Sequence, residues 1–306
     1  MSFKVASFNL KDFFDPRTDG ERPIVEDKIA NVGSLLRQAD ADVVALQEIG
    51  SSSLLDRLLT EHLGDLGYSH AHVGPVDRRG IGNAIVSRIP VVRRDIIVAD
   101  RLPFPRFAFA DAPPFPNVPL RRAVVHLTVD AGDLGEVDVL TIHFKSRLGA
   151  PMKDDQGEPI LDASPTGVAE AHIRAWILRS SEALHLRSTV DALLDADPKR
   201  RVVVLGDFND SLDAIPTRIV RGAFQYVEPA RALRSCADLV PSERRFSILH
   251  AGARDLIDHI FVSSALAEHL RGCTILNETL RDHGPYVPDG PIAPDSDHAP
   301  VVAWFE

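Results

Sequence analysis

Polar side chains recur where the apolar runs of this sequence begin or end. The clearest case is "VVVLGDFND", residues 202–210, in which four apolar residues lead through a glycine into Asp207, Asn209 and Asp210. A surface turn would explain this stretch, and so would a metal-dependent active site. Residues of similar type occupy comparable positions elsewhere in the chain, at Asn9, Glu48, His143, Asp258, Asp297 and His298.

Carboxylates, amides and imidazoles in this combination fit the hydrolysis of a phosphate ester. That reaction needs a hard divalent cation, held by oxygen ligands, to neutralise the phosphate oxygens and the leaving group. It also needs a general base to activate water and a second group to orient that base. Oxygen ligands dominate here and the sequence has no cysteine cluster, so we expect Mg²⁺ or Mn²⁺ rather than structural zinc.

Each of these residues has a simpler interpretation when it is taken alone. A carboxylate after a strand is more often a helix cap or a turn residue, and a histidine in an apolar run is more often part of the core. Asp258 resists that interpretation, because an acid inside the apolar run "LIDHIFV" is costly without a nearby partner. His298 and His143 are the candidate partners. Asp210 is assigned only to the turn.

Strands and helices must position these residues. Strand-like runs rich in β-branched residues occupy 3–8, 42–47, 83–87, 123–129, 137–144, 201–205, 256–262 and 300–305. Apolar residues at helical spacing predict a helix over 24–38, leucines between 54 and 63 predict a second, and a long third helix is expected from about Val168 to Leu194. Residues 123–144 indicate a hairpin that turns near Gly132 and Gly135. Hairpins mixed with strand–helix–strand units indicate mixed sheets covered by helices.

No linker, repeat or low-complexity tract divides the sequence, so we expect residues 1–306 to form one α/β domain. Three segments rich in proline or glycine interrupt the pattern, at 101–122, 148–167 and 286–298. Loops of this length inside a compact domain are usually functional or disordered. Each of them adjoins a residue assigned to the chemistry.

The composition is that of an ordinary globular protein, with 44% hydrophobic and 25% charged residues. The formal charge of −10 offers polyanions no general attraction, although a local arginine patch could still bind nucleic acid. No export signal is visible and no apolar run approaches the ~20 residues that span a bilayer. We therefore expect a cytoplasmic protein with no membrane-spanning segment, and nothing indicates an obligate protein partner. Cys236 and Cys273 lack metal-ligand spacing and are expected to be ordinary thiols.

Six short blocks resemble the signature blocks of the endonuclease/exonuclease/phosphatase superfamily. In order they are "SFNL", "ALQEI", "IHFKSR", "GDFND", "LIDHIFVS" and "SDHAPV", and they span residues 7 to 301. The superfamily includes pancreatic-type DNases, apurinic endonucleases, sphingomyelinases and inositol polyphosphate 5-phosphatases. The resemblance implies a four-layer α/β/β/α sandwich of two packed mixed sheets flanked by helices.

The resemblance also implies a metal site. Glu48 would be the principal ligand with Asn9 beside it, and Asp297 would complete the anionic site and could bind a second metal. Many members place an acid near the metal two residues after the equivalent of Asn9, where this chain has Lys11. A cation there argues for one tightly held metal, with Lys11 reaching a substrate phosphate or simply exposed at a strand end.

The catalytic roles implied by the resemblance centre on five residues. Asp207 would position the nucleophile or stabilise the leaving group, and Asn209 would donate to the scissile phosphate. His298 would be the general base or a phosphate-binding imidazolium, oriented by Asp258. His143 would be a second imidazole at the phosphate, as in the DNase branch. The family pattern leaves open whether Asp207 or His298 activates the water.

The substrate is assigned on fewer residues. Lys145 and Arg147 beside His143, and Arg121 and Arg122 after the first long loop, resemble the phosphate-binding cations of bacterial nuclease-like members. We therefore predict a nuclease that acts on DNA. The alternatives are a phosphodiesterase or phosphatase of a small ester, such as a lipid head group, inositol phosphate or nucleotide, and an inactive phosphate-binding scaffold. The scaffold is disfavoured because Glu48 and the acid–base residues are all present.

Overall fold

The computed structural model describes residues 2–105, 118–284, 290 and 292–306. Its first sheet is six-stranded and mixed, and its strands lie in the order β15 (Leu270–Ile275), β16 (Val301–Phe305), β1 (Phe3–Phe13), β2 (Val43–Ile49), β4 (Gly82–Ser87), β3 (His70–Val73). The second sheet is also six-stranded and mixed, in the order β11 (Arg234–Ser235), β14 (Asp258–Val262), β10 (Arg201–Asp207), β7 (Glu136–His143), β6 (Val124–Asp130), β5 (Val91–Ile97).

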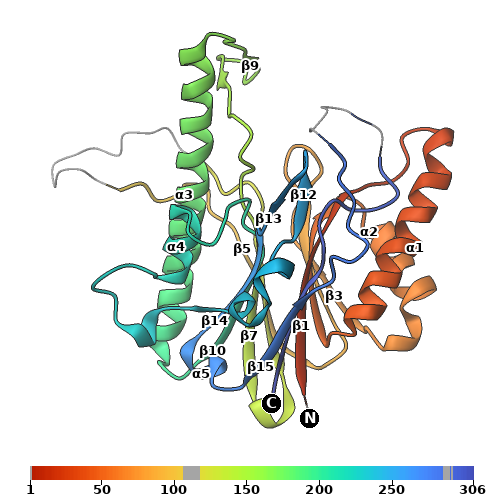
Figure 1. Ribbon diagram of the computed structural model, residues 1–306, viewed down its shortest axis with the longest axis vertical. Helices are drawn as coiled ribbons and strands as arrows, with labels where there is room; N and C mark the ends of the chain where they lie inside the picture. Colours follow the sequence, from red (N-terminus) through yellow and green to blue (C-terminus); the bar gives the residue numbers. More distant parts are fainter. Residues whose placement is uncertain (1, 106–117, 285–289, 291) are drawn as a thin grey trace.

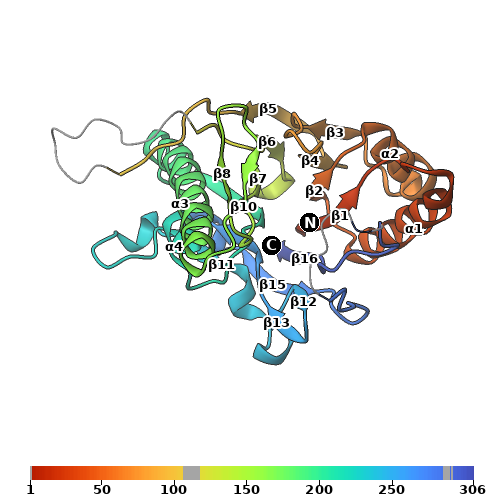
Figure 2. The ribbon, with the colours of Figure 1, turned by 90° about the horizontal axis from the view of Figure 1, so that it is seen from above.

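Helices cover the outer faces of the two sheets. The α-helices are α1 (Arg22–Ala39), α2 (Ser52–Arg57), α3 (Pro165–Ala196), α4 (Ile215–Arg221) and α5 (Ser264–Ala267). Figures 1 and 2 show α1 and α2 on one side of the packed sheets and α3 and α4 on the other. The structure therefore confirms the four-layer α/β/β/α sandwich. Two small hairpins complete the fold, β8 (Met152–Lys153) with β9 (Pro159–Ile160), and β12 (Ile248–His250) with β13 (Ala253–Asp255).

The faces that the two sheets turn toward each other change from apolar to polar along the strands. Side chains two residues apart lie on the same face, and on β10 Val203 and Leu205 belong to the inter-sheet core before Asp207 is reached. On β1, Val5 lies in the same core and Asn9, four residues later, lies on the same face of the strand. Because Asn9 and Asp207 contact each other, both sheets present their polar ends at one edge of the sandwich.

The helices and most strands follow the sequence prediction, but two strands extend further than expected. β1 continues past Asn9 to Phe13, and β2 continues past Gln47 to Ile49. The two strands pair through Asn9 with Gln47, lose register, and pair again through Phe13 with Ile49. The irregularity between these pairs contains Lys11, Asp12 and Glu48, which have positive φ values of 47°, 51° and 63°.

The strands that the sequence did not predict lie mainly at sheet edges. β3 and β15 are the two edges of the first sheet, and β5 is an edge of the second. An edge strand is solvated on one side and needs no alternation of apolar and polar residues. The second long segment, 148–167, contains the β8–β9 hairpin, whereas residues 106–117 of the first and 285–289 and 291 around the third lie outside the described residues.

Across the described ranges, no helix is long and apolar enough to cross a membrane.

Candidate active site

Asp207 is the last residue of β10 and the centre of the polar edge. Its Oδ2 accepts hydrogen bonds from Asn9 Nδ2 at 2.9 Å and Asn209 Nδ2 at 3.1 Å, and its Oδ1 accepts one from the Asn209 backbone N–H at 2.7 Å. Asn209 has a φ of 53°, a conformation that asparagine adopts more readily than most residues. This turn brings the side chains of Asp207 and Asn209 into contact.

Gly206 makes this arrangement possible. Its φ is +146°, and a Cβ at this position would lie 2.0 Å from the carbonyl oxygen of Ile142 on the neighbouring strand β7. Any larger residue would push β10 away from β7 immediately before Asp207. The glycine therefore sets the position of the carboxylate through backbone packing.

Burial and the neighbouring Asp258 together raise the pKa of Asp207 to about 7, against the opposing charge of His298. The carboxylate is 1% exposed, and removing a charged group from water favours its neutral form. Asp207 is thus a carboxylate that can take up a proton near neutral pH.

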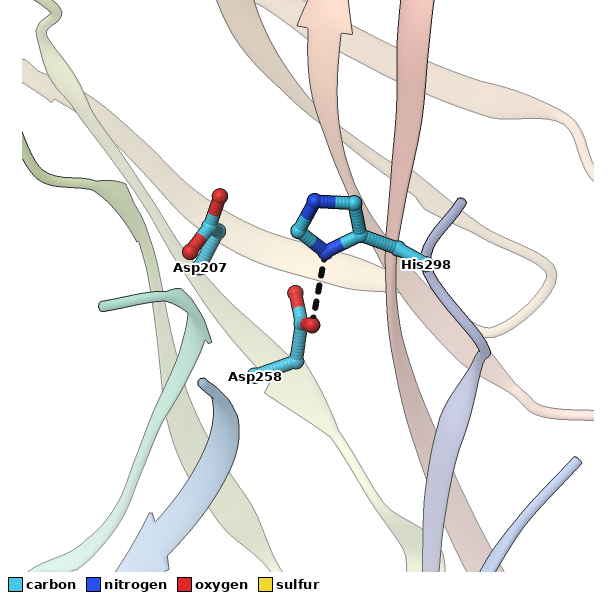
Figure 3. A group of neighbouring side chains, drawn as sticks. All are labelled: Asp207, Asp258 and His298. Atoms are coloured by element: carbon cyan, nitrogen blue, oxygen red, sulfur yellow. Dashed lines mark hydrogen bonds and ion pairs between the residues drawn. The ribbon is translucent and has the colours of Figure 1, made fainter. Parts of the chain in front are cut away.

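His298 and Asp258 form a buried pair next to Asp207 (Figure 3). The Nδ1 atom of His298 lies 2.8 Å from Asp258 Oδ2, and that oxygen also accepts a hydrogen bond from Ser247 Oγ at 2.7 Å. Burial alone would lower the pKa of His298, but Asp258, followed by Asp207 and Asp297, raises it to about 10. His298 is therefore an imidazolium at neutral pH, with its orientation fixed by Asp258.

Glu48 lies on the first sheet and faces the same edge. Its Oε2 accepts a hydrogen bond from the backbone N–H of Asp12 at 2.9 Å, and its Oε1 lies 3.5 Å from Asn9 Nδ2. His143 Nε2 is 3.8 Å from Glu48 Oε1 and 3.4 Å from Asp207 Oδ2. Burial, together with nearby Arg122, holds the pKa of His143 well below its usual range, so this imidazole is neutral.

Asp297 completes the acidic edge. Its Oδ2 contacts Lys11 Nζ at 2.5 Å, and its Oδ1 lies 3.9 Å from His298 Nε2. Asp297 Oδ1 is buried and accepts no hydrogen bond from any described residue. Lys11 is thus bonded to a carboxylate of the site rather than extended into solvent.

Three other cations predicted to bind phosphate are bonded within the protein. Arg122 is buried and donates to the carbonyl oxygens of His143 and Phe144 at 3.1 and 3.3 Å. Lys145 Nζ makes three hydrogen bonds within its own loop, and burial lowers its pKa to about 8. Arg147 is exposed but contacts Asp255 at 2.6 Å. In this structure all three cations bond to other groups of the protein at the site.

Arg121 differs from these cations. It is exposed and lines the cleft that also contains His143, Asp207 and His298. Its guanidinium forms no hydrogen bond or ion pair with another described residue. Arg78 and Arg79 line the same cleft and are likewise exposed with unbonded guanidinium groups, within the part of the chain that the structure describes. These three arginines form the cationic wall of the cleft.

Sequence reasoning missed several residues that support the site. Ser247 bonds Asp258 but has no distinctive pattern around it in the sequence. Asp210, assigned only to a turn, is buried and forms a 2.8 Å ion pair with Arg179 of α3. Arg179 also donates to the carbonyl oxygens of Lys145 and Ser146, so this pair ties the "HFKSR" and "GDFND" blocks to the same helix.

The donors at the polar edge fit a hard divalent cation. Glu48, Asp207 and Asp297 supply carboxylate oxygens, and Asn9 supplies an amide oxygen, which are ligand types that Mg²⁺ and Mn²⁺ prefer. The buried Asp297 Oδ1 without a hydrogen bond agrees with this requirement. Ligand atoms of Asp207, Asp258 and His298 also lie within 4.8 Å of one another. We consider this second group an ion-pair network, because His298 Nδ1 is already bonded to Asp258.

Residues 6–298 match the sequence pattern of the Endonuclease/Exonuclease/phosphatase family. The chain belongs to this family. The match covers nearly the whole chain and contains all of the polar edge, so the chain is a hydrolase of phosphate esters. Comparison with curated protein sequences found no match.

Solved structures show the same fold at low sequence identity. A family protein from Bacteroides thetaiotaomicron has a TM-score of 0.63 at 19% identity, covering 100% of this chain and 96% of that one. A truncated TDP2 from Caenorhabditis elegans has a TM-score of 0.60 at 15% identity, covering 99% and 97%. An AP endonuclease from Archaeoglobus fulgidus has a TM-score of 0.57 at 16% identity, covering 99% of both chains.

Proposed function

We propose that the protein is a Mg²⁺- or Mn²⁺-dependent nuclease that hydrolyses phosphodiester bonds of DNA. The cationic wall, Arg78, Arg79 and Arg121, is the observation that carries the choice of substrate. The chain has a net charge of −10, yet these three guanidinium groups line the same cleft as the catalytic residues and form no ion pair with a carboxylate of the described residues. Unpaired cations beside a phosphoesterase site suit a substrate that carries further phosphates.

The size of the cleft supports the same proposal. Its volume is about 2610 Å³, whereas sites for small ligands usually measure roughly 300–1,000 Å³. A polymer that crosses the site would use this space. The fold likeness to a protein named as an AP endonuclease agrees with nuclease activity.

The metal would be held by Glu48 and Asn9, with Asp207 facing the same ion. When bound, Mg²⁺ or Mn²⁺ supplies neutralisation of the phosphate oxygens and of the leaving group. Lys11 already neutralises one oxygen of Asp297, and this favours a single metal.

The chain's own residues supply the acid–base chemistry. Asp207, buried at the centre of the polar edge, takes the proton of the attacking water. His298, held as an imidazolium by Asp258, donates to a phosphoryl oxygen and stabilises the charge that develops there. Asn209 and neutral His143 both contact Asp207 Oδ2, at 3.1 and 3.4 Å, and orient the phosphate. A bell-shaped dependence of rate on pH should result, because Asp207 must be deprotonated and His298 protonated.

The test is a substrate panel with each metal. The wild-type protein should cleave plasmid DNA and bis(4-nitrophenyl) phosphate with Mg²⁺ or Mn²⁺, and excess EDTA should abolish both activities. Increasing salt should weaken DNA binding steeply, because phosphate contacts release counterions. Activity that is confined to lipid head groups, inositol phosphates or nucleotides and is insensitive to salt would replace the nuclease with a small-ester phosphoesterase. Absence of all hydrolysis would leave the phosphate-binding scaffold.

The cationic wall has its own test. Arg79→Gln combined with Arg121→Gln should lower kcat/KM for DNA by at least about tenfold while leaving cleavage of bis(4-nitrophenyl) phosphate within about twofold, since the small diester has no second phosphate. Arg93→Gln combined with Arg94→Gln, on the exposed strand β5, is the matched control and should change neither activity. Equal loss on both substrates in the first variant would contradict the proposed contact with flanking phosphates.

A further inference from the structure

Lys28 of α1 is a fully buried lysine close to the proposed metal site. It is 1% exposed, and its Nζ donates to the backbone carbonyl oxygens of Ala293 and Asp295, each at 3.1 Å. A lysine is almost never fully buried without partners. Here both partners belong to one short segment, and they lie five and three residues before His298.

The segment 293–298 has no regular secondary structure until β16 begins at Val301. Apart from one β-bridge between His298 and Ile248, side chains hold it. Asn31, one turn after Lys28 on α1, donates to the carbonyl oxygen of Pro294 at 2.8 Å, so α1 bonds three successive carbonyl groups. Further along, Ser296 Oγ donates to the Asn9 carbonyl oxygen at 2.7 Å and accepts the His298 backbone N–H at 3.1 Å.

The charge of Lys28 also bears on the site. Burial lowers its pKa to about 8, while the nearby carboxylates of Asp12 and Glu48 favour the charged form. A methionine would fill the same volume without burying an ammonium group, which is costly unless it is bonded. The hydrogen bonds that offset this cost lead directly to the segment that carries Asp297 and His298.

We propose that Lys28 is a positioning residue for catalysis, which fixes the segment 293–298 so that Asp297 and His298 face Asp207 and Glu48. The inference rests on the proposed phosphodiesterase function. It assigns Lys28 no contact with substrate or metal. Its effect passes through the backbone of the segment, and loss of its bonds should displace two reactive side chains together.

The primary test compares Lys28→Met with a matched buried cation. Arg187 of α3 is 8% exposed and also donates to two backbone carbonyls, those of Val220 at 3.3 Å and Arg231 at 3.0 Å, and it does not line the cleft. Both Lys28→Met and Arg187→Met should lower the thermal midpoint. Only Lys28→Met should lower kcat for bis(4-nitrophenyl) phosphate, by about 10²-fold, with KM within about threefold, because small displacements of reacting groups cost about this much.

Lys28→Arg keeps a charged donor for the two carbonyls and should recover at least tenfold of the lost kcat.

Hydrogen exchange gives a readout that does not depend on activity. The backbone amides of His298 and Ala299, which are bonded to Ser296 Oγ and to the Ser247 carbonyl, should exchange faster in Lys28→Met and at the wild-type rate in Arg187→Met.

A folded Lys28→Met protein with kcat within about threefold of wild type overturns the inference. If that variant does not fold, Lys28→Gln and Asn31→Ala take its place, and unchanged kcat in both has the same consequence. An inactive wild-type protein would instead contradict the proposed function. The two failures are therefore distinguishable.

Discussion

Replacing Asp258 with asparagine should separate the charge of this residue from its shape. Asp258 is 0% exposed and its Oδ2 lies 2.8 Å from His298 Nδ1. With an effective dielectric constant of about 20, two unit charges at this separation attract by roughly 6 kcal/mol. Desolvation offsets part of that attraction, and removing one partner of a buried pair typically costs about 3–5 kcal/mol. Because the change also relieves repulsion between Asp258 and Asp207, we expect a loss of about 3 kcal/mol in the free energy of unfolding.

The effect on rate should be larger than this loss of stability suggests. Without the charge of Asp258, the pKa of His298 falls and the imidazolium loses its counterion. General acid–base groups contribute about 10²–10⁴-fold to a rate, so kcat for bis(4-nitrophenyl) phosphate with Mg²⁺ should fall by a factor in that range. KM should change little, since Asp258 has no exposed surface for substrate to contact.

The protein contains a matched control for this change. Asp138 is 1% exposed and also lies 2.8 Å from a histidine nitrogen, Nε2 of His126, but neither residue lines the cleft. Asp138→Asn should lower stability, measured by urea unfolding, and leave kcat within about twofold of wild type. If folded Asp258→Asn retains wild-type kcat, or if both variants lose activity equally, the role of the Asp258–His298 pair in catalysis is refuted.

Two further outcomes follow from the same geometry. In metal-free protein, His298 has a pKa of about 10 against an ordinary 6.5. Its contribution to stability is therefore full below about pH 6.5 and is lost as the pH rises through about 10. In urea unfolding, the stability of His298→Gln should decline less over this range than that of wild type, and equal declines would contradict the assignment. Gly206→Ala would place a methyl group 2.0 Å from the Ile142 carbonyl oxygen. It should lower the free energy of unfolding by at least about 1–3 kcal/mol and abolish most activity. Gly132→Ala is the control, because Gly132 also has a positive φ but no atom within 4 Å of the added methyl group; it should cost about 1–2 kcal/mol and leave the rate unchanged.

The sequence predicts the layers of this fold because its central strands are strongly apolar. Residues 202–205 are buried on both sides, so their hydrophobic signal is continuous. Edge strand β5 carries Arg93, Arg94 and Asp95 and is exposed along most of its length. No local pattern separates such a strand from a loop, since its structure depends on pairing with β6.

The proposed catalytic residues were found from their types and order, but the residues that hold them were not. Asp258 stands out as an acid in an apolar run, and the structure places it at the start of β14. Lys28 lies between Val25 and Val32 on the apolar face of α1, but the local sequence does not identify the carbonyl groups that would bond its ammonium. Its burial arises only when the distant segment 293–298 packs over α1, and Asp210 gains its partner Arg179 in the same way. Contacts between segments this far apart leave no mark on local sequence.

The polar edge is divided between the two sheets, and this bears on how the protein folds. Asn9 and Glu48 belong to the first sheet, whereas His143, Asp207 and Asp258 belong to the second. A partly folded chain with either sheet formed alone would show strand structure by circular dichroism but would lack half of the site. The recovery of phosphoesterase activity during refolding therefore reports when the two sheets dock. The delay between recovery of the circular dichroism signal and recovery of activity measures how long docking follows strand formation.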